Sequence, residues 1–210
     1  MMKALLSVVL ACAVASGALQ HPIANCDSLL SVSGRTGIRC SKEANGSQLL
    51  RYLNGVTPDK QNAKCVTFAI DEVGRLRYAP AIPVLVRLID FKRPPTEAEE
   101  RGTHIRMRGF YPAVNALEEI GEQSRPSVLD AIKDPSTSVK AQENAVSVWM
   151  ELFKYETPHG ISILRQEADK SNAPNIKERL MWAILRAQNM CNPEDQLQCK
   201  EAAKMGGIKQ

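Results

Sequence analysis

Two six-residue segments, Ala69–Gly74 (AIDEVG) and Ala116–Gly121 (ALEEIG), repeat one pattern and decide the fold. Each places a small residue, an aliphatic residue, two acids, a β-branched aliphatic residue and a glycine in the same order. A proline-initiated apolar segment follows each copy, at residues 83–90 and then at 126–134. A helix–glycine–helix unit that recurs in this way indicates an array of helical repeats.

Apolar residues around the motifs recur at helical spacing. Val66, Ala69, Ile70 and Val73 lie three or four residues apart and share one helix face, which leaves the two acids that follow Ile70 outside. A helix pair of this kind needs neighbours on each side to bury its faces. We expect a short helix at 47–53, helix pairs at 58–78 with 81–91, 110–122 with 126–133 and 138–154 with 157–168, and a final helix at 174–189.

The motif residues resemble the HEAT-repeat family, including its short bacterial HEAT-like version first described in phycobilisome lyases. The resemblance also uses Ala81–Leu85 (AIPVL) and Asp134-Pro135 followed by Val139-Lys140, and it covers residues 58–189. It implies an all-α fold, a right-handed α–α superhelix that forms a short solenoid of three to four helix pairs. HEAT-like arrays serve mainly as interaction scaffolds, and a minority act on bilins or DNA.

The chain departs from the family pattern in several places. Residues 92–108 form an insert, Met150 stands where the third repeat would have its glycine, and Lys140 replaces an arginine that is common in the family. The N-terminus also carries an export signal, described below. The sequence divides into a signal peptide at 1–18, a loop-rich segment at 19–46, a repeat domain at 47–190, and a C-terminal disulfide loop and tail at 191–210.

The N-terminus has the pattern of a secretory signal peptide. Lys3 precedes an apolar run of about a dozen residues and then small residues, so we expect cleavage after Ala18, with Ala15 as the alternative. The run is too short to span a bilayer as a permanent helix. In a second interpretation the residues before Cys12 form a bacterial lipobox, and Cys12 carries a lipid anchor.

Export would place the cysteines in an oxidising compartment, which favours disulfides. We expect the pairs Cys26–Cys40 and Cys191–Cys199, because each flanks a short polar segment. Cys65 lies within a helical pattern and is interpreted as a buried thiol, with a Cys40–Cys65 bond as the rival connectivity. No CxxC motif or nearby histidine completes a zinc site, and we expect no metal and no cofactor.

Two sets of polar residues are candidates for binding a partner. The first lies four and seven residues after the prolines that open the three second helices, where solenoids present an inner surface. Its members are Arg87, Asp90, Asp130, Lys133, Ser162 and Arg165. The second set belongs to the insert, which offers donors to an anionic group, and comprises Arg101, His104, Arg106 and Arg108. The alternative for both sets is a solvated surface, on which the insert arginines pair with nearby glutamates.

Composition narrows the function. The 27 basic and 23 acidic residues are scattered, so the net charge of +4 gives no clustered footprint for nucleic acid. The sequence holds neither a recognisable nucleophile motif nor a glycine-rich phosphate loop. We therefore expect an exported, non-catalytic scaffold, periplasmic or secreted, that binds another protein of a bacterial cell envelope. A ligand-binding or lyase-like HEAT-repeat enzyme is the alternative.

Overall fold

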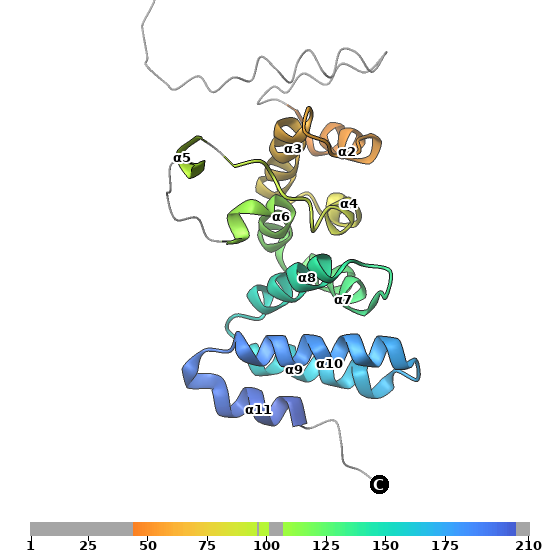
Figure 1. Ribbon diagram of the computed structural model, residues 1–210, viewed down its shortest axis with the longest axis vertical. Helices are drawn as coiled ribbons and strands as arrows, with labels where there is room; N and C mark the ends of the chain where they lie inside the picture. Colours follow the sequence, from red (N-terminus) through yellow and green to blue (C-terminus); the bar gives the residue numbers. More distant parts are fainter. Residues whose placement is uncertain (1–43, 96, 101–106, 205–210) are drawn as a thin grey trace, which may run out of the picture.

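The computed structural model describes residues 44–95, 97–100 and 107–204, and all regular secondary structure in these ranges is helical. Layers of helices are stacked along one long axis in sequence order, from α2 (Gly46–Gly55) at one end to α11 (Gln196–Lys204) at the other, and the short α5 (Glu97–Glu100) lies to one side (Figure 1). The expected signal peptide at 1–18 and the Cys26–Cys40 pair lie outside the described residues. The all-α fold class is therefore confirmed for the described part of the chain.

The helices are short, and 3-10 turns separate several of them. The α-helices are α2 (Gly46–Gly55), α3 (Ala63–Arg75), α4 (Ile82–Arg87), α5 (Glu97–Glu100), α6 (Pro112–Ile120), α7 (Arg125–Lys133), α8 (Val139–Leu152), α9 (Thr157–Lys170), α10 (Pro174–Asn189) and α11 (Gln196–Lys204). The 3-10 turns are η1 (Ala79–Ala81), η2 (Met107–Phe110), η3 (Gly121–Ser124) and η4 (Pro193–Asp195). Five of the α-helices carry a proline in their first turn, where its missing N–H has no intrahelical partner to lose.

The first motif helix begins later than the sequence predicts. We expected a start at Pro58, but α3 begins at Ala63. Asp59 accepts the backbone N–H of Asn62 at 2.9 Å, and the Asn62 amide donates to the Thr57 carbonyl at 3.0 Å. These side chains compete with helical hydrogen bonds and hold residues 57–62 as a turn.

The helices pair differently from the expected units. α7 packs along α8 and α9 packs along α10, as the adjacent ribbons in Figure 1 show, whereas α8 and α9 contact each other much less. The extensive contacts thus join helices of different expected pairs, and the predicted pairing of 138–154 with 157–168 is wrong. The reason lies in the connections. Asp134 accepts the Ser136 N–H at 2.8 Å and Ser138 caps α8, which together close a tight turn between α7 and α8.

The two motif copies meet in space, because α3 packs against α6 more extensively than any other pair of helices in the described ranges. Their glycines serve different purposes. A Cβ atom on Gly74 would lie 2.7 Å from the Ala116 Cα atom, so the absent side chain permits close approach of the two helices. Gly121 instead ends α6 at a φ of 82°, a backbone conformation that favours glycine.

The core is continuous from α2 to α11 and consists mainly of aliphatic side chains. Trp149 is buried as expected, and its indole N–H donates to the Gly160 carbonyl at 3.0 Å. That bond joins α8 to the first turn of α9. Trp182 is only partly buried, although it packs against the same core.

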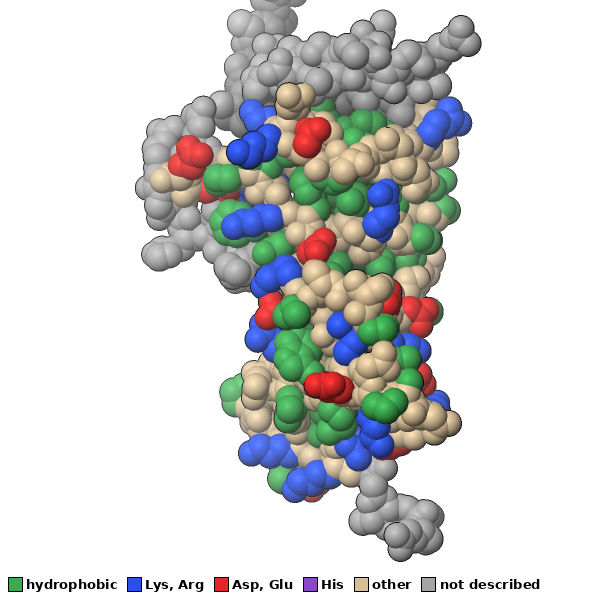
Figure 2. Space-filling model, turned by 45° about the vertical axis from the view of Figure 1, so that its right-hand side comes forward, with side chains coloured by type: hydrophobic (Ala, Val, Ile, Leu, Met, Phe, Trp, Pro, Cys, Tyr) green, Lys and Arg blue, Asp and Glu red, His purple; other side chains and the backbone are tan. Residues whose placement is uncertain are grey.

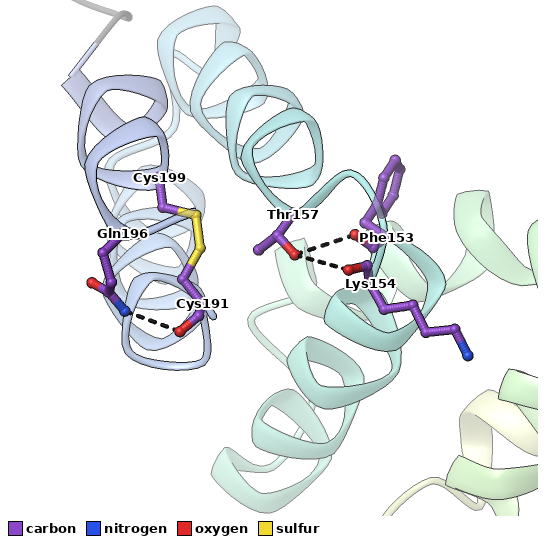
Figure 3. Close-up of a disulfide and its surroundings, with 6 residues drawn as sticks. All are labelled: Phe153, Lys154, Thr157, Cys191, Gln196 and Cys199. Atoms are coloured by element: carbon purple, nitrogen blue, oxygen red, sulfur yellow. Dashed lines mark hydrogen bonds between the residues drawn. A yellow bond between two sulfur atoms is a disulfide. The ribbon is translucent and has the colours of Figure 1, made fainter. Parts of the chain in front are cut away.

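Residues 196–204 form a helix, α11, where the sequence predicted a disulfide loop and a tail. Cys191 and Cys199 form the expected disulfide, but the second cysteine lies on α11, which packs against α9 and α10 (Figure 3). Gln196 donates to the Cys191 carbonyl at 3.0 Å and fixes the start of this helix. The last helix therefore covers the end of the stack.

Cys65 is disulfide-bonded, so its interpretation as a buried free thiol is wrong. Its partner lies outside the described residues. Burial of Cys65 on α3 hid this role in the sequence, because a buried cysteine at helical spacing has the same pattern as a small apolar residue.

The approach of α3 to α6 can be tested with two glycine substitutions. We expect Gly74→Ala to lower the free energy of unfolding by about 1–3 kcal/mol, because the new methyl group meets the α6 backbone. Gly55→Ala is the matched control, since nothing lies within 4 Å of a Cβ atom there. Urea unfolding of both variants measures the difference. Equal stability of the two would contradict the close approach.

Candidate interaction surface

The expected polar face mostly contacts the neighbouring helix layers. Arg87 on α4 donates to the Leu53 carbonyl at the end of α2, with 2.9 Å between nitrogen and oxygen. Asp90 accepts the Ser138 hydroxyl at 2.7 Å, although 48 residues separate them in sequence. Both side chains therefore join layers, a role that the sequence pattern did not reveal.

The later members of the face behave in the same way. Lys133 on α7 bridges Asp130 on its own helix and Glu167 on α9, each at 3.3 Å. Arg165 pairs with Asp169 at 3.4 Å and donates to the Met181 sulfur on α10 at 3.3 Å. Ser162 accepts a long hydrogen bond from Gln166, at 3.5 Å. These residues do lie on the following helices as expected, but they do not converge on one site.

Side chains on several helices donate hydrogen bonds to backbone carbonyl groups at or just after the ends of other helices. Asn144 on α8 is buried and donates to the Ile89 carbonyl at 2.8 Å. Arg179 on α10 donates to the Ile132 carbonyl at 3.2 Å, and Arg125 on α7 donates to the Leu152 carbonyl at 2.8 Å. The last carbonyls of a helix lack intrahelical partners, so these donors supply bonds that the backbone cannot.

The basic insert is described only in part. Arg101, His104 and Arg106 lie outside the described residues, and so does the Arg108 side chain. The described part contains Arg93, which pairs with Glu99 on α5 and donates to the Gly109 carbonyl at 2.6 Å. Arg93 thus fastens both ends of the insert together. Its place beside two prolines in a charged stretch gave no signal of that role.

The acids of the two motif copies share one seam between α3 and α6. The pKa of Asp71 is raised to about 6, chiefly by burial and then by the Glu119 carboxylate, while the Arg93 guanidinium opposes the rise. The Asp71 side chain is exposed by its accessible area, as expected for the outside of the motif. Neighbouring atoms therefore crowd this carboxyl group without covering it.

A small notch lies between α6, α8 and α10, and sequence reasoning missed it. Its volume is about 130 Å³. It is lined by Tyr111, Val114, Lys140, Glu143, Asn144, Ser147 and Arg186. Three helices supply these side chains, so only the stacked structure brings them together.

The rest of the described surface mixes charge signs. Figure 2 shows basic and acidic side chains interspersed with apolar ones on the face in view, without a field of one sign. Within the described ranges, no group of three or more His, Cys, Asp or Glu residues is placed to hold a metal ion. None of the helices described is both long and apolar enough to cross a membrane.

No protein-family model, curated protein or solved structure matches the chain. The resemblance to HEAT repeats therefore stays a prediction from the motif residues.

The crowded Asp71 carboxyl group predicts a pH dependence of stability. Its folded-state pKa, about 6, lies above the ordinary value, so ionisation destabilises the folded protein. The stability that the protonated Asp71 side chain provides is complete below about pH 4 and is lost as the pH rises through the folded-state pKa. We expect Asp71→Asn, which does not ionise, to match the wild type near about pH 4 and to be more stable near about pH 7. Solvent screening limits the gain to on the order of 1 kcal/mol or less.

Urea unfolding at both pH values measures this gain. Glu178→Gln, which removes one exposed charge from α10, is the control for net charge. A constant difference between Asp71→Asn and wild type across this range would contradict the crowding of the carboxyl group.

Proposed function

We propose that this chain is an exported, non-catalytic scaffold whose helices form a HEAT-like right-handed superhelix and bind another protein of the cell envelope. The observation that carries the proposal is the stacking of helix layers in sequence order along one axis. Stacks of this kind expose a long surface for their size, and repeat proteins use such surfaces for partners.

One continuous row of helices supports a protein partner. α3 contacts α6, α6 contacts α8, and α8 contacts α10, so these four helices follow one another along the stack. Their outer residues include acids on α3 and α6, the Lys140–Glu143 pair on α8, and the exposed Leu185 on α10. Mixed charges with isolated apolar residues are ordinary for the surface that a non-obligate protein partner covers.

Export is supported by two independent features. The sequence before Ala18 has the charge and apolar pattern of a signal peptide. Cys191, Cys199 and Cys65 are all disulfide-bonded, which fits an oxidising compartment. The bacterial periplasm or the extracellular space provides such conditions.

Production of the full chain in a bacterium, followed by cell fractionation, tests the export part. We expect the mature protein outside the cytoplasm, beginning at Leu19, with Cys65, Cys191 and Cys199 protected from alkylation until a reductant is added. Intact mass and peptide mapping measure both properties, and a variant without residues 1–18 is the control. A full-length cytoplasmic chain with free thiols would contradict export.

Chemical cross-linking and capture from native envelope extract tests the scaffold part. We expect the tagged wild-type protein to retain a defined envelope protein at a fixed stoichiometry, identified by mass spectrometry. Retrieval of only abundant chaperones would overturn the scaffold proposal, whatever the result of the export test.

A further inference from the structure

The notch between α6, α8 and α10 carries more positive than negative charge. Lys140 and Glu143 on α8 form an ion pair across one turn. Arg186 on α10 lines the same notch and makes no hydrogen bond or ion pair with any residue that the structure describes. Two cations thus face one carboxylate, and the second cation has its donors free.

The other residues that line the notch favour an occupant with a hydrogen-bond acceptor. Tyr111 is buried apart from about a tenth of its surface and places its phenol at the notch. Lys140 interacts electrostatically with both Tyr111 and Arg186, which places the three groups within range of one another. An arginine fork binds a carboxylate through two parallel hydrogen bonds, and such charge-assisted bonds are stronger than neutral ones.

The size of the notch limits its occupant. Small-molecule and cofactor sites enclose roughly 300–1,000 Å³, whereas this volume is about 130 Å³. A cavity of about 150 Å³ holds a molecule the size of benzene. The notch therefore accommodates a single side chain and not a whole cofactor.

Apolar residues flank the free cation. Trp182 precedes Arg186 by four residues and Met190 follows it by four, so the three lie along one stripe of α10 and its end. Met190 is exposed and Trp182 is partly buried. On α8, the exposed Val139 precedes Glu143 by the same spacing. An occupant that combines an acidic with a neighbouring apolar side chain would meet both kinds of surface.

We propose that this notch binds an acidic side chain from an apolar-acidic segment of the partner protein, with Arg186 as the principal donor. The inference rests on the scaffold function proposed above and names the partner's chemistry. Arg186 holds the carboxylate, Tyr111 and Lys140 lie beside it, and the stripe of Trp182 and Met190 contacts the neighbouring apolar residues.

A short peptide of alternating leucine and glutamate is the probe, and the same peptide with glutamine in place of glutamate is its control. Titration into the isotope-labelled full chain should shift the amide signals of residues 111–114, 140–147 and 186 with the acidic peptide only. We expect Arg186→Glu to weaken binding by roughly tenfold or more, because it replaces the fork with a repelling charge. Raised ionic strength should weaken wild-type binding.

Lys177→Glu is the matched variant, because Lys177 is an exposed cation nine residues earlier and on the opposite side of α10. It should bind the peptide as the wild type does. Equal weakening by Lys177→Glu and Arg186→Glu, shifts confined to other residues, or equal binding of the glutamine peptide would each overturn the proposal. So would binding to anionic lipid vesicles, lost in Arg186→Glu, without binding to the acidic peptide.

The two proposals fail separately. A partner that both wild type and Arg186→Glu retain equally from envelope extract would overturn the notch and leave the scaffold function intact. Failure of wild type to retain any defined partner would overturn the scaffold function, whatever the peptide result.

Discussion

The stack depends on how the carbonyl groups at its helix ends find donors. Short helices leave many such groups without intrahelical partners, and an unpaired carbonyl inside a protein costs about 1–3 kcal/mol. Here the donors come from other helices. Arg87 serves the end of α2, Asn144 the turn that follows α4, Arg179 the end of α7, and Arg125 the end of α8. Most of these bonds cross from one layer to another, so the layers are fastened at their edges as well as through the apolar core.

This arrangement explains why the expected partner face is occupied. Polar residues at regular spacing beside an apolar stripe can bond either to a partner protein or to the end of a neighbouring helix, because both offer donors and acceptors. The sequence pattern is the same in the two cases. In this chain Arg87, Asp90, Lys133 and Arg165 bond within the stack. Arg186, on the row of helices that runs through α3, α6, α8 and α10, makes no hydrogen bond or ion pair with the residues that the structure describes.

The sequence predicted the positions of the helices better than it predicted which helices pack against each other. Periodicity and prolines located most helices, because both act locally, and the short range between Cys191 and Cys199 predicted their bond. Pairing of α7 with α8 was missed, since turn closure around Asp134 and Ser138 depends on side-chain geometry, and the pairing of α9 with α10 was missed as well. α11 was missed because its sequence is mostly polar, and its contacts with α9 and α10 cannot be read from the sequence. The notch brings together residues up to 75 positions apart, from Tyr111 to Arg186, and no local pattern encodes that distance.

Substitution of Asn144 tests the role of the helix-end bonds most directly. Leucine at this position keeps the branched shape of the side chain, although it is larger, and removes the donor to the Ile89 carbonyl, which lies 2.8 Å away in a buried site. The free energy of unfolding of Asn144→Leu, measured in urea beside the exposed control Asn172→Leu, should fall by about 1–3 kcal/mol relative to the control. A value for Asn144→Leu within about 0.5 kcal/mol of the control would contradict the account, because the apolar core alone would then hold the layers together.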